Sequence, residues 1–461
     1  MLKKKSAASA SDPLRKEFES LLAEFVNIPT VSADPDHRGD IERAARLAAS
    51  TIERFGGKAK ILQTAGNPIV HGVFDHDSSA PTLTIYNHLD VQPASRETEP
   101  WDGEPFRMEI DGDRYLGRGT TDDKGPALSA LFAIREARRK KTPLNLRVLW
   151  EFEEEIGSPN FASGIRPAAK ELATDSVLVS DTIWVSREQP ACPAGLRGLQ
   201  GFVLTLETGV TDQHSGVTGG AARNPLAELI KLASEMHDGQ TGKVKIKGFY
   251  DDVEPPTREE LAEFKRSGFS VKQFKKDHLF KSIRTEDPLE LMKRIWTQPT
   301  MEVHGLVGGY TGPGLKTIIP PRAELKITCR LVPGQKPPKI AKLVKDFIKS
   351  RNPDVRVDVH ERMFPYKAPT TGPLPDAVRA SMKYAFGTEP VFVREGGSIG
   401  AVIEMERILK VPVMFLGLSL PEHGYHAPNE RFDWQQAGGG MVAFGHYFET
   451  LAKLPREKRR R

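Results

Sequence analysis

The stretch Thr82-Leu83-Thr84-Ile85-Tyr86-Asn87-His88-Leu89-Asp90 joins a short apolar run to a polar end that carries a histidine and an aspartate. Three other short runs rich in β-forming residues end in a similar way. They are Leu146–Trp150, followed by Glu153-Glu154-Glu155; Ser176–Val179, followed by Ser180-Asp181; and Val411–Leu416, followed by His423-Gly424-Tyr425-His426. Such runs predict strands. Because ligands bind beyond the carboxyl ends of strands in an open α/β sheet, the pattern predicts a metal centre there.

A fifth acidic element, Gly117–Gly125, contains Asp122 and Asp123 and directly precedes an apolar pattern with helical spacing. Mixed histidine and carboxylate ligands suit zinc, or manganese and cobalt where oxygen dominates, and a shared carboxylate holds two ions about 3.5 Å apart. Each element alone is more often a solvated polar segment of the protein surface than a set of metal ligands. Together they would be a costly cluster of negative charge without a cation, so the conjunction favours the metal site.

The fold class predicted for this chain is α/β, with a mostly parallel sheet flanked by helices. Helical spacing at Pro13–Asn27 and Asp40–Phe55 precedes strand candidates at Ala59–Leu62 and Ile69–Phe74, and helix and strand then alternate to Asp181. This βαβ rhythm is typical of a sheet with helices on both faces.

After Leu199 the pattern changes to that of a separate α+β unit. Its expected strands are Phe202–Thr208, Met301–Val307, Glu324–Val332 and Val355–His360, its expected helices are Asn224–His237 and Lys339–Lys349, and residues 243–298 show no clear period. Because Asp181 precedes this unit and His426 follows it, we interpret it as an insertion. The expected domains are residues 1–199 (catalytic, first part), 200–366 (inserted) and 367–461 (catalytic, second part), with a Pro/Gly/Thr-rich linker at residues 365–375.

Composition indicates an ordinary globular protein of two domains. The chain has 461 residues, 38% hydrophobic and 28% charged, with a net charge of only +5. Much of the positive excess lies in Lys3-Lys4-Lys5 and Arg456–Arg461, which we interpret as solvated tails. We therefore expect no nucleic-acid partner.

No apolar stretch follows the first lysines, and no run approaches membrane-spanning length, so we expect neither a secretory signal nor a membrane partner. The only two cysteines, Cys192 and Cys329, lie far apart. This usage fits a reducing compartment and excludes a cysteine-based metal site, and we expect a cytoplasmic location.

The residues also resemble a known family, the dinuclear-zinc metallopeptidases that include cytosolic non-specific dipeptidase, carnosinase, aminoacylase and succinyl-diaminopimelate desuccinylase. The matching pieces run through most of the chain in family order, and they look closest to the dipeptidase branch. They are Asn87–Pro93, Gly117–Pro126, Glu154–Ser158, Leu196–Gly198, His214–Gly216, Arg330–Pro333 and Glu395–Ile399. The resemblance implies a zinc-exopeptidase-like catalytic domain and makes the insertion a lid and dimerisation domain.

The resemblance implies two Zn²⁺ ions per subunit, with Mn²⁺ or Co²⁺ as substitutes. His88 and Asp181 would be the terminal ligands of one ion and Glu155 and His426 those of the other, with Asp122 bridging. Glu154 matches the general base that takes a proton from the metal-bridging water, and Asp90 matches the carboxylate that orients His88. The family also implies a cis peptide bond between Asp122 and Asp123.

In the inserted domain, the resemblance gives His214 the role of holding the oxyanion in the neighbouring subunit's site of a homodimer. Arg330 looks like the clamp on the substrate's terminal carboxylate, helped by Thr317, Gly397 and Ser398, since a guanidinium pairs with a carboxylate at two points. From the residues alone, an arginine inside a strand is more often an exposed side chain on the surface of a sheet. A histidine before Ser-Gly is more often a turn residue.

Two places depart from the dipeptidase pattern. His423 competes with His426 for the last metal position, although the following Ala427-Pro428-Asn429-Glu430 favours His426. The segment His360–Tyr366 lacks the glycine-rich look of a substrate-contact loop. The expected substrate is a dipeptide or related small peptide with a free carboxylate, and the alternative is an N-acyl amino acid.

Two rival functions are weaker. Gly396-Gly397-Ser398-Ile399-Gly400 satisfies the Gly-x-Ser-x-Gly pattern of a serine hydrolase that would use Ser398, with His426 downstream. That hypothesis leaves the acidic elements without a role. A non-catalytic relative would be indicated by the loss of a ligand or of Glu154, and all of them are present.

Overall fold

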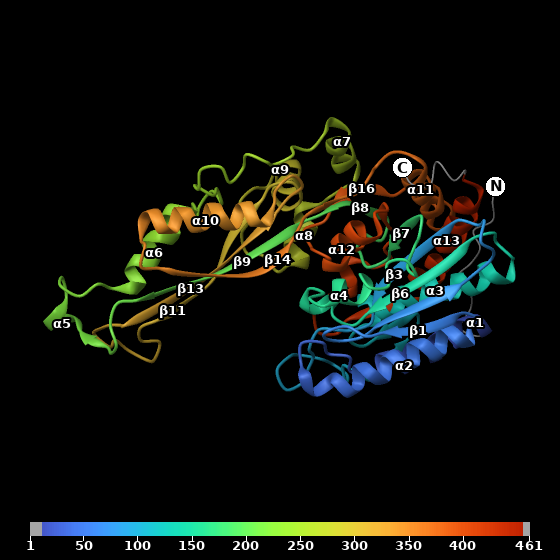
Figure 1. The fold of residues 1–461 in the computed structure, drawn as a ribbon, viewed down its shortest axis with the longest axis horizontal. Helices are drawn as coiled ribbons and strands as arrows, with labels where there is room; N and C mark the ends of the chain where they lie inside the picture. The colour runs from blue at the N-terminus through green and yellow to red at the C-terminus, as the bar shows by residue number, and fades with distance from the viewer. Residues whose placement is uncertain (1–11, 455–461) are drawn as a thin grey trace.

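The computed structural model describes residues 12–454. The two expected basic tails, Lys3–Lys5 and Arg456–Arg461, lie outside the described residues. Figure 1 shows two lobes, one built on a central sheet and the other extending from it as an arm.

A six-stranded sheet in the order β1-β2-β6-β3-β7-β17 is the centre of the first lobe. Its strands are β1 (Lys58–Leu62), β2 (Ile69–Phe74), β3 (Thr82–His88), β6 (Asn145–Glu151), β7 (Ser176–Val179) and β17 (Val413–Phe415). The four neighbours β6, β3, β7 and β17 are parallel, whereas β1 and β2 pair antiparallel. The mostly parallel α/β sheet expected from the sequence is confirmed.

Helices cover both faces of this sheet (Figure 1). One face packs against α1 (Pro13–Val26), α2 (Arg38–Arg54), α3 (Gly125–Arg139), α11 (Pro373–Phe386) and α13 (Trp434–Lys453), and the other against α4 (Phe161–Ile165) and α12 (Gly400–Leu409). Side chains of one strand alternate between these two cores: Ile85 joins the first and Tyr86 the second. The sequence pattern left α11, α12 and α13 unpredicted.

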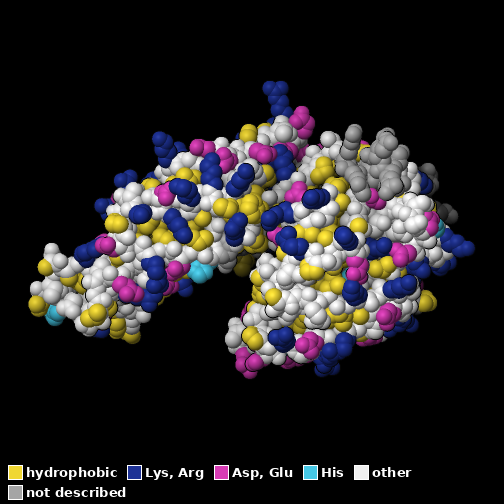
Figure 2. Space-filling view, in the orientation of Figure 1, with side chains coloured by type: hydrophobic (Ala, Val, Ile, Leu, Met, Phe, Trp, Pro, Cys, Tyr) yellow, Lys and Arg dark blue, Asp and Glu magenta, His cyan; other side chains and the backbone are white. Residues whose placement is uncertain are grey.

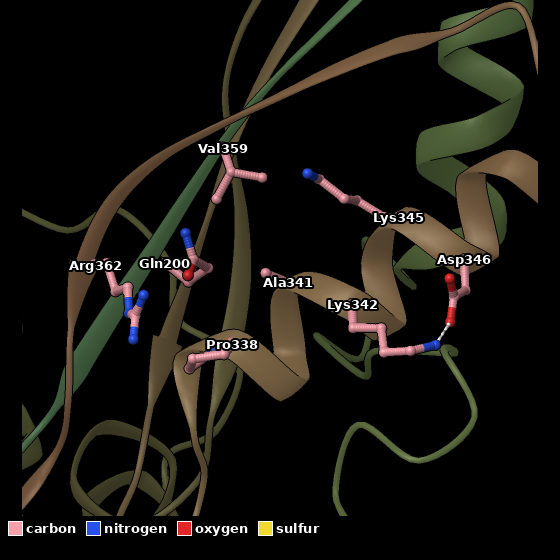
Figure 3. Close-up of a pocket in the computed structure, with 8 residues that line it drawn as sticks. All are labelled: Gln200, Pro338, Ala341, Lys342, Lys345, Asp346, Val359 and Arg362. Atoms are coloured by element: carbon pink, nitrogen blue, oxygen red, sulfur yellow. Dashed lines mark hydrogen bonds and ion pairs between the residues drawn. The ribbon is translucent and has the colours of Figure 1, made fainter.

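The arm contains a four-stranded antiparallel sheet in the order β11-β13-β9-β14. Its strands are β9 (Gly198–Glu207), β11 (Thr300–Gly308), β13 (Arg322–Leu331) and β14 (Arg356–Met363), and α6 (Pro225–Met236) and α10 (Pro337–Arg351) pack on it around a separate apolar cluster. A groove of about 380 Å³ lies between α10 and β14, and its lining includes Lys345, Arg362 and Lys342, which forms an ion pair with Asp346 (Figure 3).

Residues 243–298, which lack a clear period in the sequence, include three short helices: α7 (Arg258–Arg266), α8 (Val271–Asp277) and α9 (Pro288–Trp296). Thr257 and Glu260 form a capping box at the start of α7. Phe264 of α7 and Trp296 of α9 pack against Val391 and Val393 of β16 (Val391–Arg394). Helices this short give too few turns for a period to be visible.

A three-stranded sheet, β15-β8-β16, joins the lobes. Strand β8 (Ala191–Leu196) leads through Arg197 into β9, and β14 returns through Phe364 and Pro365 to β15 (Tyr366–Lys367). The two crossings lie side by side, because Leu199 pairs with Met363 and Leu196 with Tyr366. The domain boundaries at residues 200 and 366 stay a prediction.

Short elements complete the described chain. They are β4 (Glu109–Asp111), β5 (Arg114–Leu116), β18 (Arg431–Asp433), β10 (Gln213–His214), β12 (Ile318–Ile319), α5 (Ser215–Thr218) and single turns at Pro35–His37, Thr120–Lys124, Glu154–Ile156 and Pro421–His423. On the face shown in Figure 2, basic and acidic side chains are interspersed over both lobes. No described helix is long and apolar enough to cross a membrane.

Candidate metal centre

The ends of three parallel strands bring the predicted ligands to one edge of the central sheet. His88 is the last residue of β3, Asp181 follows β7 by two residues, and the turn Glu154–Ile156 follows β6. Since β3 lies between β6 and β7, His88 stands between the two acidic elements. This is the crevice in which open α/β sheets bind their ligands.

Asp122 lies between two histidines and offers each a different oxygen. Its Oδ1 is 2.9 Å from His88 Nε2, and its Oδ2 is 3.1 Å from His426 Nε2. Each histidine has a second carboxylate beside it: Asp181 Oδ2 is 3.8 Å from His88 Nε2, and Glu155 Oε2 is 3.1 Å from His426 Nε2. The geometry is that of two adjacent ligand sets that share Asp122.

The turn Thr120–Lys124 places Asp122 beside both histidines. The peptide bond between Asp122 and Asp123 is cis, which confirms the expectation from the family resemblance. Asp123 is also buried, and its Oδ2 accepts a hydrogen bond from Asn87 Nδ2 at 2.7 Å. Asp123 is therefore turned away from the histidines that Asp122 contacts, and α3 begins two residues later.

Asp90 holds both His88 and the glutamate turn. Its carboxylate oxygens accept hydrogen bonds from the backbone N–H groups of Glu154 (3.2 Å) and Glu155 (3.1 Å). The Nδ1 atom of His88 lies 3.1 Å from the backbone oxygen of Asp90 and 3.4 Å from its Oδ1. A metal-ligating histidine usually has such an acceptor at its second nitrogen, so Asp90 can fix the orientation of the ring.

The electrostatics of the cluster favour positive charge. Burial raises the pKa of Glu154 well above its ordinary value and the pKa of Asp181 to about 7. Neighbouring acidic groups raise both pKa values further, because like charges repel. Hydrogen bonds to Asp122 and Glu155 raise the pKa of His426 to about 10.

Two groups of these side chains, His88–Asp122–Glu155 and His88–Glu154–Asp181, place one ligand atom each within 4.8 Å of the others. Divalent cations would supply the missing charge, and the donor set of imidazole and carboxylate fits zinc, manganese or cobalt.

His423 and His426, which compete for the last metal position, differ in their contacts. His423 is buried, its Nε2 lies 3.2 Å from Asp433 Oδ2, and its Nδ1 accepts a hydrogen bond from the backbone N–H of Leu420. His426 is half exposed, has a positive φ of 56°, and lies beside Asp122 and Glu155. His423 thus belongs to the support of the loop, and His426 faces the cluster.

The sequence pattern of Peptidase family M20/M25/M40 matches residues 84–450, which include His88, Asp122, Glu155, Asp181 and His426. The chain belongs to this family.

Similar proteins cover almost the whole of this M20 peptidase. The Cys-Gly metallodipeptidase dug1 of Schizosaccharomyces pombe is 32% identical over 96% of this chain and 97% of its own length, and human Beta-Ala-His dipeptidase is 28% identical over 95% and 90%. Among solved structures, the M20 family metallo-carboxypeptidase Sso-CP2 of Sulfolobus solfataricus has a TM-score of 0.89 at 31% identity, covering 95% of this chain and 100% of that one. The resemblance to the dipeptidase branch is confirmed.

In this M20 peptidase, Arg330, Gly397 and Ser398 meet at the junction of the lobes. Arg330 Nη1 donates to Ser398 Oγ at 3.2 Å, and Ser398 Oγ donates to the backbone oxygen of Arg197. The carbonyl of Gly397 accepts from the backbone N–H of Arg197 at 3.0 Å. In the described chain the Ser398 hydroxyl bonds to Arg330 and Arg197 and to no histidine, and His426 contacts Asp122 and Glu155 instead. The geometry therefore gives no support to a serine nucleophile at Ser398.

His214 and Thr317 lie together, but far from the cluster. His214 pairs with Ile318 across the two short strands β10 and β12, and the backbone N–H of Ser215 donates to the carbonyl of Thr317 at 3.0 Å. Both His214 and Thr317 are exposed. The adjoining helix α5 is at the far end of the arm, opposite the central sheet (Figure 1). Within one chain, these two predicted residues do not reach the other site residues.

Two further groups near the cluster received no role from the sequence. The Oε2 atom of Glu395 is buried without a hydrogen-bond partner in the described chain, and burial raises the pKa of Glu395 to about 8, with Asp181 and Asp122 adding to the effect. Tyr425 donates its hydroxyl to Asp181 Oδ1 at 3.4 Å. Glu395 directly follows strand β16, so the signal that identified the ligands, an acid at a strand end, was present for it too.

Proposed function

We propose that this M20 peptidase is a metal-dependent dipeptidase that hydrolyses the amide bond of dipeptides and related small peptides with a free carboxylate. The observation that carries the proposal is Asp122 between His88 and His426, each with its own second carboxylate. The relatives named for Cys-Gly and Beta-Ala-His support the substrate class.

The proposed centre holds two divalent ions, and the expected metal is Zn²⁺. His88 and Asp181 would hold one ion, Glu155 and His426 the other, and Asp122 both. When bound, such ions polarise a carbonyl and lower the pKa of a water towards neutrality. The residues of this chain position the ions and move the proton.

Glu154 is the proposed general base and later the general acid. It stands on the same turn as Glu155, and the Asp90 carboxylate accepts its backbone N–H, so its carboxyl is held at the cluster by a fixed backbone. A carboxylate that binds a metal has its lone pairs occupied, which leaves the proton transfer to its neighbour. Glu154 would take the proton from the attacking water and give it to the leaving amine.

Two charged groups fit the two ends of a dipeptide. Arg330, positioned by Ser398, would pair with the terminal carboxylate, with Gly397 as a further contact and Thr317 as one that only the arm of a second subunit could supply. The unpartnered Oε2 of Glu395 would accept from an α-ammonium group, which supplies the positive charge that a buried carboxylate lacks. An N-acyl amino acid has no such ammonium, so this feature favours dipeptides over the deacylase alternative.

The proposed active form is a homodimer in which each arm delivers His214 to the partner's site to hold the oxyanion. The position of His214 and Thr317 at the tip supports this, because neither has a contact with the cluster of its own chain in the described residues. The tip also exposes large apolar side chains: Val210 and Leu315 are 98% exposed and Val217 is 79% exposed. Such side chains are typical of a surface covered by a partner. In this proposal residues 200–366 are the lid and dimerisation domain.

The cytoplasmic location stays a prediction. It is consistent with the two cysteines, because Cys192 and Cys329 are both free and buried.

Metal removal tests the reaction class. We expect a chelator to abolish hydrolysis of Cys-Gly or β-Ala-His, and Zn²⁺, Mn²⁺ or Co²⁺ to restore it. Full activity in a protein shown by metal analysis to be empty would contradict the proposal.

A matched substrate set tests the recognition of the two ends. A dipeptide, its N-acetyl form and its C-terminal amide differ only in the charged groups assigned to Glu395 and Arg330. We expect efficient cleavage of the free dipeptide alone. Equal cleavage of the N-acetyl form would instead favour the deacylase alternative.

A further inference from the structure

Glu430 joins the two loops that carry Asp122 and His426. It lies four residues after His426, it is completely buried, and the backbone carbonyl of Glu430 accepts the N–H of Gly117 at 2.9 Å. The chain from His426 to Glu430 is thus tied to the start of the acidic loop.

The carboxylate of Glu430 is bound by four donors of that loop. Oε1 accepts the backbone N–H groups of Thr121 at 3.0 Å and Asp122 at 3.1 Å, and Oε2 accepts the backbone N–H of Gly119 at 3.0 Å and Arg118 Nη1 at 2.8 Å. One side chain therefore binds the backbone at Gly119, Thr121 and Asp122 itself. A carboxylate with several such bonds is a rigid anchor, because charge-assisted hydrogen bonds are short and strong.

A gain in folding stability alone does not explain why Glu430 and Arg118 form a buried ion pair. Removing both charges from water is costly, and well-packed apolar residues often replace a buried ion pair without loss of stability. The pair is also incompletely satisfied, since Nε and Nη2 of Arg118 have no hydrogen-bond partner in the described chain, although the guanidinium lies 5.2 Å from the Trp101 ring centroid. What the arrangement does provide is a fixed position of Asp122 relative to His426.

We infer that Glu430 is a positioning residue that sets the geometry of the paired metal centre by holding the Asp122 loop in register with the His426 loop. The inference rests on the proposed two-metal function. Asp122 is the one group shared by both ligand sets, so a shift of its backbone changes both at once. Loss of Glu430 is therefore expected to weaken the pairing of the ions rather than one terminal ligand.

The test compares Glu430→Gln with Glu260→Gln. Glu260 is the matched control, because it is a buried carboxylate that pairs with a buried arginine, Arg394, at 2.9 and 3.1 Å but lies outside the centre. We expect Glu430→Gln to lower metal affinity and kcat by about 10–100-fold, with KM changed less than kcat. In the Mn²⁺-loaded protein the electron paramagnetic resonance signal of a coupled ion pair should shrink. Glu260→Gln should keep two ions per chain and the wild-type signal.

The outcomes separate the inference from the proposed function. A folded Glu430→Gln protein with two ions, wild-type affinity and the wild-type coupled signal would overturn the role of Glu430. If Glu430→Gln does not fold, Glu430→Asp tests the positioning role instead, because aspartate keeps the charge but is shorter by one methylene. Glu430→Asp should lose the coupled signal, and a wild-type signal in it would overturn the inference. A wild-type protein that never binds a pair of ions would instead refute the proposed function itself.

Discussion

The cluster at the edge of the central sheet and the tip of the arm differ in how far one chain completes them. At the cluster, His88, Asp122 and Asp181 are buried, and His88 has both carboxylates beside it within the same lobe. At the tip, His214 and Thr317 are exposed and contact mainly their own turn. One chain therefore brings the predicted ligands of the cluster together, whereas His214 and Thr317 at the tip contact no predicted ligand of the same chain in the described residues.

The largest expected effect tests the self-contained cluster. Glu154→Gln should lower kcat by about 10²–10⁴-fold while metal content stays at the wild-type level, because it removes the base and leaves the ligands. Steady-state kinetics and metal analysis measure the two quantities. Glu153→Gln is the control: Glu153 accepts the backbone N–H groups of Asn67 and Asn160, so it supports the turn without serving the reaction. An empty centre in Glu154→Gln would instead assign the ligand role to Glu154.

The next effect tests the tip. His214→Ala should lower kcat by about 10²–10³-fold with full metal content, since an oxyanion donor acts mainly in the transition state. His278→Ala, an exposed histidine elsewhere in the arm, should change little. An active monomeric protein would show that the tip is not needed.

Mixed dimers sharpen this result. If His214 acts in the partner's site, a dimer of one Glu154→Gln chain and one His214→Ala chain has one intact site. Equal mixing makes about half of the dimers mixed, so roughly a quarter of the wild-type activity should return. Mixed dimers that form and stay inactive would refute the arrangement in trans.

A smaller effect is expected where the lobes join. Arg330→Lys keeps the charge but loses two-point pairing with a carboxylate, so KM for a dipeptide should rise about tenfold with kcat less affected. The C-terminal amide of the same dipeptide is the control substrate, and its kinetics should hardly change. An equal loss on both substrates would show that Arg330 does not recognise the carboxylate.

The smallest effect on activity is expected from a buried histidine in the cluster's lobe but outside the site, because its titration changes stability instead. Burial, with Arg147 nearby, lowers the pKa of His71 to about 4 from 6.5. The unfolded chain then binds the proton more tightly, so the stabilisation is complete above pH 6.5 and is lost as pH falls towards 4. The loss is at most about 3 kcal/mol. Denaturant unfolding of the metal-free protein at several pH values should show this slope, and His71→Leu should reduce it; an unchanged slope would exclude His71 as its source.

Sequence alone predicted what depends on local pattern. Strands β2 and β7 begin and end at the expected residues, and the predicted ligands meet because parallel strands end at one edge. The motif Ala427–Glu430 favoured His426 over His423, but the contact of His423 with Asp433 ten residues later could not be predicted from spacing. The bonds of Glu430 span more than 300 residues, which no local pattern records.

The side-by-side crossings between the lobes, together with the packing of α7 and α9 on β16, have a mechanical consequence. If only the two adjacent crossings joined the lobes, the arm could rotate about them as a hinge. Phe264 and Trp296 pack against Val391 and Val393, so a rotation of the arm would break an apolar contact. This contact thus restrains rotation of the arm about the two crossings, and it ties the position of the tip to the lobe that contains the central sheet.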